Sequence, residues 1–256
     1  MSITILNRLL TMPTSQLAGR LKRIANQSGW EWYLFPPRYD YYGDGKVVLV
    51  AHIDCVRDPE LDDRLVWSTG ADGRRWVCRV DNTGAPTILG ADDRAGVYAA
   101  MRIYRELAGT EYQPAVLLCN GEESGKTGAL EAAEALGASF GYEALCLIEL
   151  DRRNTWEAVF YNLEPDSFRE RIFSFGFTER VGSGSDISVL GPVFGVCAAN
   201  LSVGYKFAHS EKESLCFEDL LVCTIGTKRV VEELTREGIR WELRPENEDL
   251  SGELVR

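Results

Sequence analysis

The chain has 256 residues, of which 45% are hydrophobic, so it is long enough to bury one sizeable core. Its formal net charge of −11 argues against a nucleic-acid partner, because phosphate binding requires a clustered positive field. No apolar run approaches the length of a membrane span, and the apolar start at residues 3–10 is too short for a signal peptide. We therefore expect a soluble single domain with neither a membrane nor a nucleic-acid partner.

Residues 3–28 are typical of two short helices, with Thr14 or Ser15 as the N-cap of the second helix. A strand is expected near Trp30–Phe35, and a second apolar strand begins at Val47. The first part of the chain therefore predicts a helical start followed by buried strands.

Residues 64–90 contain two apolar runs separated by Ala71-Asp72-Gly73, which is a hairpin signal. Further along, helices are expected at about residues 93–107, 124–137 and 217–237. In residues 156–190 the only element we predict is a loop at the sequence GSGSD. Strands that alternate with crossover helices predict an α/β fold, with a mostly parallel central sheet covered by helices on both faces. Residues 1–240 then form one domain, and residues 241–256 form a charged tail.

The seven cysteines are an odd number without CxxC spacing, and several fall in expected core strands. They are typical of reduced, buried thiols and so indicate a cytoplasmic protein. Their positions are 55, 78, 119, 146, 197, 216 and 223.

Three apolar runs end in residues that commonly ligate metals. VVLVAHID reaches His52 and Asp54, AVLLCNGEE reaches Glu122 and Glu123, and ALCLIELD reaches Asp151. Such runs are typical of buried parallel strands, and open α/β sheets bind ligands at the carboxyl ends of their strands. We therefore expect these side chains to meet at one edge of the sheet.

Asp92 and His209 extend this pattern, and the chain has no histidines other than His52 and His209. In chain order the candidate ligands are His52, Asp92, Glu123, Asp151 and His209. Imidazole and carboxylate groups in these numbers suit two adjacent divalent ions that share a bridging carboxylate. An acid normally orients a ligating histidine, and Asp54 would share a strand face with His52. Glu122, beside Glu123, is then free to act as a general base.

Five segments resemble, in order, the motifs of the co-catalytic zinc aminopeptidases and related hydrolases of the M28, M20 and M42 metallopeptidase families. The segments are AHIDCV, LGADDRAGVYAA, NGEESGKTGA, LIELDRR and NLSVGYKFAHSEKE, and they span roughly residues 45–235. The resemblance implies a phosphorylase/hydrolase-like α/β fold. Members with a lid or dimerisation domain carry a long insertion between motifs, and no gap here is long enough for one, so the lidless form is expected.

The resemblance also implies roles for the matching residues. One metal ion would be held by His52 and Asp151 and the other by Glu123 and His209. Asp92 would bridge the two ions, and the peptide bond that follows it would be cis. Asp54 would orient His52, and Glu122 would be the general base.

The implied cofactors are two divalent ions, zinc first of all, with cobalt or manganese as alternatives. The implied activity is hydrolysis of an amide bond in a small peptide or acylated amine, with an aminopeptidase as the first choice. Arg152 and Arg153 depart from the small or apolar residues that are common in the family at these positions. The substrate preference and the oligomeric state are left open.

Several alternatives remain open from the sequence. A glutaminyl-cyclase-like enzyme, a non-peptide amidohydrolase or deacylase, and a non-catalytic binding protein can all share this scaffold. NGEESGKT also resembles a P-loop, although its two glutamates oppose a phosphate.

Four further residues have two interpretations each. Glu149 faces the same side of its strand as Asp151 and can replace it as a ligand. Ser185 and Asp186 resemble a pair near the family's substrate pocket, but their composition is equally that of an ordinary loop. Tyr205 is either an oxyanion donor or, by preference, a packed tyrosine.

Overall fold

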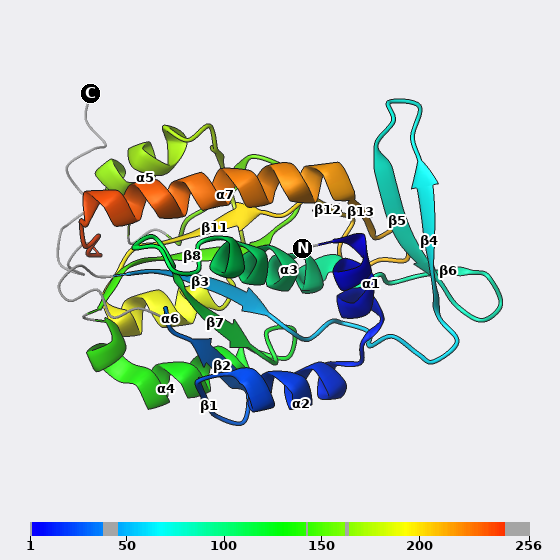
Figure 1. Cartoon of the computed structure of the whole chain (residues 1–256), viewed down its shortest axis with the longest axis horizontal. Helices are drawn as coiled ribbons and strands as arrows, with labels where there is room; N and C mark the ends of the chain where they lie inside the picture. Colours follow the sequence, from blue (N-terminus) through cyan, green and yellow to red (C-terminus); the bar gives the residue numbers. More distant parts are fainter. Residues whose placement is uncertain (1, 38–45, 142, 162–163, 244–256) are drawn as a thin grey trace.

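The computed structural model describes residues 2–37, 46–141, 143–161 and 164–243. Its main sheet contains β1 (Gln27–Ser28), β2 (Trp32–Phe35), β3 (Lys46–His52), β7 (Ala115–Cys119), β8 (Ala144–Arg152), β9 (Glu157–Val159), β10 (Thr178–Arg180) and β11 (Ala198–Ser202). The strand order is β1-β2-β7-β3-β8-β11-β9-β10 (Figure 1). The four central strands, β7, β3, β8 and β11, are parallel, whereas β2 and β9 join them antiparallel. The predicted mixed, mostly parallel sheet is therefore confirmed.

Helices cover both faces of this sheet, as predicted. They are α1 (Ile3–Thr11), α2 (Thr14–Ile24), α3 (Ala91–Glu106), α4 (Thr127–Gly141), α5 (Asp166–Phe173), α6 (Ile187–Phe194) and α7 (Phe217–Glu237). Helices α3 and α7 pack on one face, and α4 and α6 pack on the other (Figure 1). No lid domain is present in the described part of the chain.

Strand β3 shows why the central strands are apolar along their whole length. Val47 and Leu49 belong to the core under α3 and α7, while Val48 and Val50 belong to the core under α4 and α6. Successive side chains point to opposite faces of a sheet, so a strand covered on both faces must be apolar at every position. All four residues are at most 1% exposed. Strand β3 ends at the first candidate ligand, His52.

A second sheet has the order β12-β13-β5-β4, with β6 paired to β5. Its strands are β4 (Arg64–Thr69), β5 (Arg75–Val80), β6 (Pro86–Thr87), β12 (Tyr205–Lys206) and β13 (Ser214–Cys216). Strands β4 and β5 form the predicted hairpin, which projects from the body of the molecule (Figure 1). Gly73 in its turn has a φ of 79°, a conformation that glycine adopts without strain.

Some local predictions were wrong. The N-cap of α2 is Pro13, and Thr14 is already helical, with its hydroxyl bonded to Asp58. Helix α4 begins at Thr127 rather than near 124, because Gly125 and Lys126 have positive φ angles. Between residues 156 and 190 the chain forms β9, α5, β10 and α6, none of which we predicted, although residues 181–185 form the expected loop.

The predicted tail begins as part of the domain. Trp241 donates its backbone N–H to Leu145 and accepts a hydrogen bond from the N–H of Cys197. Residues 244–256 lie outside the described part of the chain. No helix among the described residues is both long and apolar enough to cross a bilayer.

Gly96 provides a test of the packing between α3 and β8. A Cβ at this position would lie 1.9 Å from the carbonyl oxygen of Leu150 and 2.4 Å from the carboxylate of Asp93. Because one of these atoms belongs to the backbone, Gly96→Ala should lower the free energy of unfolding by about 1–3 kcal/mol. Urea denaturation measures the change.

Gly19 in α2 is the matched control, since nothing lies within 4 Å of a Cβ built there. Gly19→Ala should stabilise the protein by about 0.5–1 kcal/mol, because alanine loses less backbone entropy in a helix. Equal stability of the two variants would contradict the close approach of α3 to β8.

Candidate metal centre

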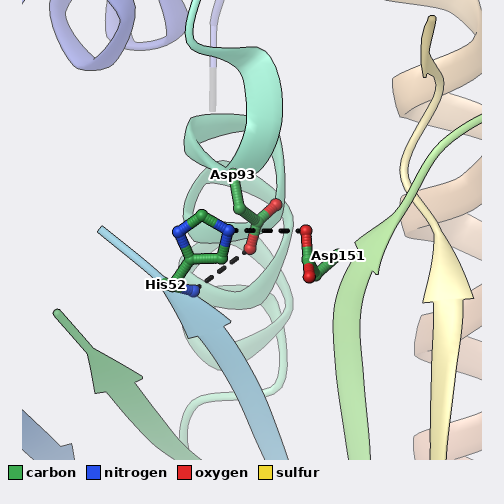
Figure 2. Close-up of side chains that lie close together, drawn as sticks. All are labelled: His52, Asp93 and Asp151. Carbon is green, nitrogen blue, oxygen red and sulfur yellow. Dashed lines mark hydrogen bonds and ion pairs between the residues drawn. The ribbon is translucent and has the colours of Figure 1, made fainter. Parts of the chain in front are cut away.

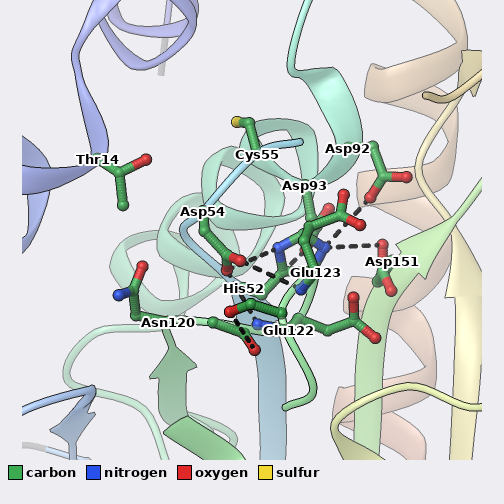
Figure 3. A network of polar contacts seen from close by, with 12 residues as sticks. Thr14, His52, Asp54, Cys55, Asp92, Asp93, Asn120, Glu122, Glu123 and Asp151 are labelled. Carbon is green, nitrogen blue, oxygen red and sulfur yellow. Dashed lines mark hydrogen bonds and ion pairs between the residues drawn. The ribbon is translucent and has the colours of Figure 1, made fainter. Parts of the chain in front are cut away.

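The carboxyl ends of the parallel strands bring the predicted ligands together. His52 is the last residue of β3, and Asp151 is the penultimate residue of the neighbouring strand β8. Glu123 follows β7, Asp92 lies in the first turn of α3, and His209 lies between β12 and β13. Figure 3 shows four of these five side chains converging on one point. The side chains that the sequence pattern singled out thus lie together at the carboxyl edge of the sheet, as expected.

Asp92 lies between the two histidines. Its Oδ1 is 3.2 Å from His52 Nε2, and its Oδ2 is 3.1 Å from His209 Nε2. The same nitrogen of each histidine also faces a second acid. His52 Nε2 lies 3.5 Å from Asp151 Oδ1 (Figure 2), and His209 Nε2 lies 2.9 Å from Glu123 Oε1. One carboxylate therefore separates two His–acid pairs, which is the arrangement that a shared ligand between two cations requires.

Asp54 lies against the other nitrogen of His52, 3.3 Å from Nδ1. Strand β3 ends at His52, so the expected alternation along a strand is not what places Asp54 there. Its carboxylate instead accepts the backbone N–H groups of Glu122 and Glu123, at 3.2 and 3.1 Å (Figure 3). These contacts hold the acid beside the imidazole.

The hydrogen bonds from the amides of Glu122 and Glu123 to Asp54 argue against the P-loop alternative. In a phosphate cradle the backbone amides of the loop point at the bound anion. Here the amides of Glu122 and Glu123 donate to Asp54, and both glutamate side chains carry negative charge into the region. The loop geometry therefore opposes phosphate binding.

Asp93 is an acid of the site that sequence reasoning did not single out. It is fully buried, and its carboxylate accepts the backbone N–H of His52 at 3.2 Å (Figure 2). It also accepts the backbone N–H of Gly96 at 2.9 Å. Oxygen atoms of Asp93 also lie close enough to His52 and Asp151 to share an ion with them. The Asp92–Asp93 peptide bond is cis, as the resemblance implied. The only sequence signal for Asp93 was its place in an acidic pair.

Polar neighbours hold Asp151 in place. Ser185 donates its hydroxyl to Asp151 Oδ2 at 3.0 Å, and Tyr205 donates to Oδ1 at 3.2 Å. The amide oxygen of Asn200 accepts the backbone N–H of Asp151 at 3.0 Å. Tyr205 is only 3% exposed, and its hydroxyl lies at the cavity against Asp151. Glu149, the alternative ligand, is fully buried and has no hydrogen bond or ion pair to either histidine in the described part of the chain.

A second acid that the sequence did not reveal is Glu213. It is fully buried, and it accepts the backbone N–H groups of Gly90 at 2.8 Å and Asp92 at 3.0 Å. These bonds fix the segment that leads into α3 and carries Asp92.

The crowding of acids shifts their proton affinities. Burial and the negative charge of Asp92 raise the pKa of Glu123 to about 7 and that of Asp151 to about 6. Burial opposes protonation of His52, but the charge of Asp151 and its other carboxylate neighbours outweigh burial and hold the pKa well above 6.5. Hydrogen bonding to Asp92 raises the pKa of His209 to about 9. These shifts indicate an excess of negative charge that a bound cation would relieve.

The donor set fits divalent metal ions. It consists of imidazole nitrogens and carboxylate oxygens, which are the ligands that zinc, cobalt and manganese accept. His52 with Asp92 and Glu123, and His52 with Asp93 and Asp151, each bring one ligand atom per residue within 4.8 Å of the others. His209 has a φ of 60°, a left-handed conformation that is rare for a non-glycine residue and is concentrated at functional sites.

A cavity of about 790 Å³ opens beside these residues. Its walls include Asp92, Glu123, Asp151 and His209, together with the predicted base Glu122. The volume is in the range of pockets that enclose small ligands.

The fold is shared with several solved peptidase structures. Aminopeptidase PepT from Bacillus cereus has a TM-score of 0.64 and 15% identity, and the match covers 91% of this chain and 97% of that chain. For a tripeptidase from Staphylococcus aureus the TM-score is 0.64 and the identity 14%, with coverage of 91% and 98%. For aminopeptidase APDkam598 from the archaeon Desulfurococcus kamchatkensis the values are 0.59 and 17%, with coverage of 93% and 96%.

At these identities the likeness shows the fold alone. No protein-family model matches the sequence, and no curated protein matches it.

The raised pKa values predict an unusual pH dependence for the metal-free protein. Burial raises the pKa of Glu213 and Asp186 to about 7, like that of Glu123, and the hydrogen bond to Asp92 raises the pKa of His209 to about 9. In this range the folded state binds more protons than the unfolded state, so stability falls as pH rises. The melting temperature of EDTA-treated protein should therefore decrease from about pH 5.5 to about pH 8.5.

Glu123→Gln should flatten this profile, because the amide does not titrate. Asp92 and Asp54 have lowered pKa values and act only at more acidic pH. A melting temperature that rises over the same interval would contradict the buried, uncompensated state of these acids.

Proposed function

We propose that the protein is an aminopeptidase that hydrolyses amide bonds with two divalent metal ions, zinc first of all. The observation that carries this proposal is the position of Asp92, with one oxygen facing each histidine. His52 and Asp151 would hold one ion, and Glu123 and His209 would hold the other. Asp92 would contribute one carboxylate oxygen to each.

When bound, the ions polarise the scissile carbonyl and acidify a water molecule, which supplies the nucleophile. The residues of this chain orient their ligands and transfer protons. Asp54, 3.3 Å from His52 Nδ1, would fix the ring so that Nε2 faces the site. Ser185 and Tyr205 would fix the carboxylate of Asp151 in the same way.

Glu122 would be the general base. It lines the cavity, and its backbone N–H is anchored on Asp54, whereas its neighbour Glu123 turns toward His209. The Glu122 carboxylate would take a proton from the attacking water and deliver it to the nitrogen of the leaving amine. Of these two adjacent residues, Glu123 would thus be a metal ligand and Glu122 the base.

Among the possible cleavage positions, we favour the peptide bond at the amino terminus of the substrate. The cavity of about 790 Å³ suits short substrates. The solved structures of similar fold are named as aminopeptidases and a tripeptidase. A deacylase for other acylated amines would use the same chemistry, and the substrate panel described below separates the two.

The metal count is the first test. Two ligand pairs around a shared acid predict two zinc ions per chain after supplementation with zinc, measured by elemental analysis. Asp92→Ala removes the shared ligand and should lower both occupancies, whereas His209→Ala should lower mainly one. Zinc-supplemented protein that retains no metal would refute the two-ion proposal.

Glu122→Gln separates the base from the ligands. The change keeps the side-chain volume and removes the proton acceptor, so turnover should fall by about 10² to 10⁴ while the zinc content stays unchanged. Glu123→Gln is the matched control, because it should lower the zinc content itself. The turnover of both variants is measured on a panel of aminoacyl, acetyl and carboxyl-terminal substrates, and their zinc content by elemental analysis. Near-normal turnover by Glu122→Gln would show that another group takes the proton.

A further inference from the structure

The cavity beside the metal-ligand residues has a basic wall as well as an acidic one. Lys126, Arg152 and Arg153 all line it. The chain carries a formal net charge of −11, so this grouping of cations is a local feature and not the result of a basic composition. The acids that line the same cavity, Asp92, Glu122, Glu123 and Asp151, are those that we assign to the metal ions and the base.

Arg152 is already paired. Its Nε lies 3.0 Å from Glu157 Oε2, and the other oxygen of Glu157 lies 3.4 Å from Arg180 Nε. Two guanidinium groups therefore share a single carboxylate. This cluster is held in place by its own contacts and leaves one positive charge in excess.

Arg153 is in a different state. Its side chain is exposed, and no ion pair or side-chain hydrogen bond to it is found within the described ranges. Its backbone is nevertheless fixed, because the carbonyl oxygen accepts the hydroxyl of Ser202 at 2.9 Å. An anchored backbone and a free guanidinium, two residues after Asp151, present up to five N–H donors at the edge of the cavity.

Lys126 approaches the cavity from the loop before α4. Its Nζ lies 3.8 Å from Glu122 Oε1, which is a long ion pair, and its side chain is 27% exposed. The end of this side chain also reaches Gly184, where an added Cβ would lie 3.9 Å from Nζ. The ammonium group therefore lies between the acid that we propose as base and the glycine-rich loop.

We propose that Arg153, assisted by Lys126, binds a carboxylate of the substrate in this cavity. The inference rests on the proposed hydrolysis and adds the substrate class to it. Arginine and carboxylate form paired, charge-assisted hydrogen bonds, which are among the stronger polar contacts in proteins. In the sequence Asp151-Arg152-Arg153, neither arginine is a proposed metal ligand. The proposed carboxylate binding gives this basic pair a function.

A short peptide can present this carboxylate from three places: the side chain of its first residue, the side chain of its second residue, or its carboxyl terminus. A cavity of about 790 Å³ is large enough for a dipeptide in any of these orientations. The chemistry that Arg153 recognises is the same in all three.

The test measures binding separately from turnover. Three pairs of dipeptides are used in which a methylene replaces the scissile carbonyl, so that hydrolysis is impossible. The pairs compare Glu with Gln as the first residue, Glu with Gln as the second residue, and a free carboxyl terminus with its amide. Isothermal titration calorimetry in buffer containing zinc gives the affinity ratio within each pair.

The wild type should prefer the acidic member of at least one pair by about tenfold or more, as expected for a charged hydrogen bond. Arg153→Gln should reduce that ratio to within about twofold, and Lys126→Gln should reduce it in part. Arg64→Gln is the control: Arg64 is an exposed arginine on the β4 hairpin, outside the cavity lining, and its loss removes the same charge. This variant should keep the wild-type ratio.

Ratios below about twofold in all three wild-type pairs would overturn the proposal, as would a preference that survives Arg153→Gln unchanged. The ordinary dipeptides are assayed for amine release in parallel. Acid-selective binding without any hydrolysis would refute the proposed peptidase activity and leave the carboxylate site intact. Hydrolysis without acid-selective binding would support the peptidase activity and refute the carboxylate site.

Discussion

The fold has to hold several buried carboxylates next to one another, and most of the local structure around the site follows from this constraint. Asp92, Asp93 and Asp151 lie within one small region beside His52, and Glu123 adds a further charge beside His209. Like charges at such distances repel strongly when water is excluded. The parallel pairing of β3 with β8 and the packing of α3 across them bring the acids close despite that repulsion.

Apart from the two histidines, the groups that hold these acids are neutral donors. Hydroxyl groups from Ser185 and Tyr205 contact Asp151, and backbone N–H groups contact Asp54, Asp93 and Glu213. Such contacts fix the position of each carboxylate without cancelling its charge. The negative potential at the centre is therefore preserved, and a divalent ion can satisfy it with little rearrangement of its ligands. An arginine in the same place would stabilise the empty site and compete with a metal ion.

The sequence predicted the part of the site that depends on strand ends. Apolar runs reveal parallel strands, and the residue at the end of each run must lie at the carboxyl edge, so His52 and Asp151 were placed together correctly. The supporting acids were not predictable in this way, because Glu213 reaches the backbone of Asp92 across 121 positions of sequence. Helices α5 and α6 were missed because each has only eight residues, too few for a clear period. The prediction of the α2 N-cap was wrong because the hydroxyl of Thr14 has a tertiary partner, Asp58, and is not available for capping.

The two walls of the cavity have opposite charge, so the net charge of the cavity depends on whether metal ions are bound. Carboxylates that hold metal ions would be neutralised by them, whereas Arg152 and Lys126 keep one acidic partner each and Arg153 has no ion pair within the described ranges. With metal bound, the cavity would therefore be positive inside a chain that is negative as a whole. A field of this kind attracts anionic groups from solution and repels basic side chains. If metal ions bind as proposed, the acidic composition of the chain is a poor guide to its substrate, because the charges that would face the substrate are those left after the metal ligands have been neutralised.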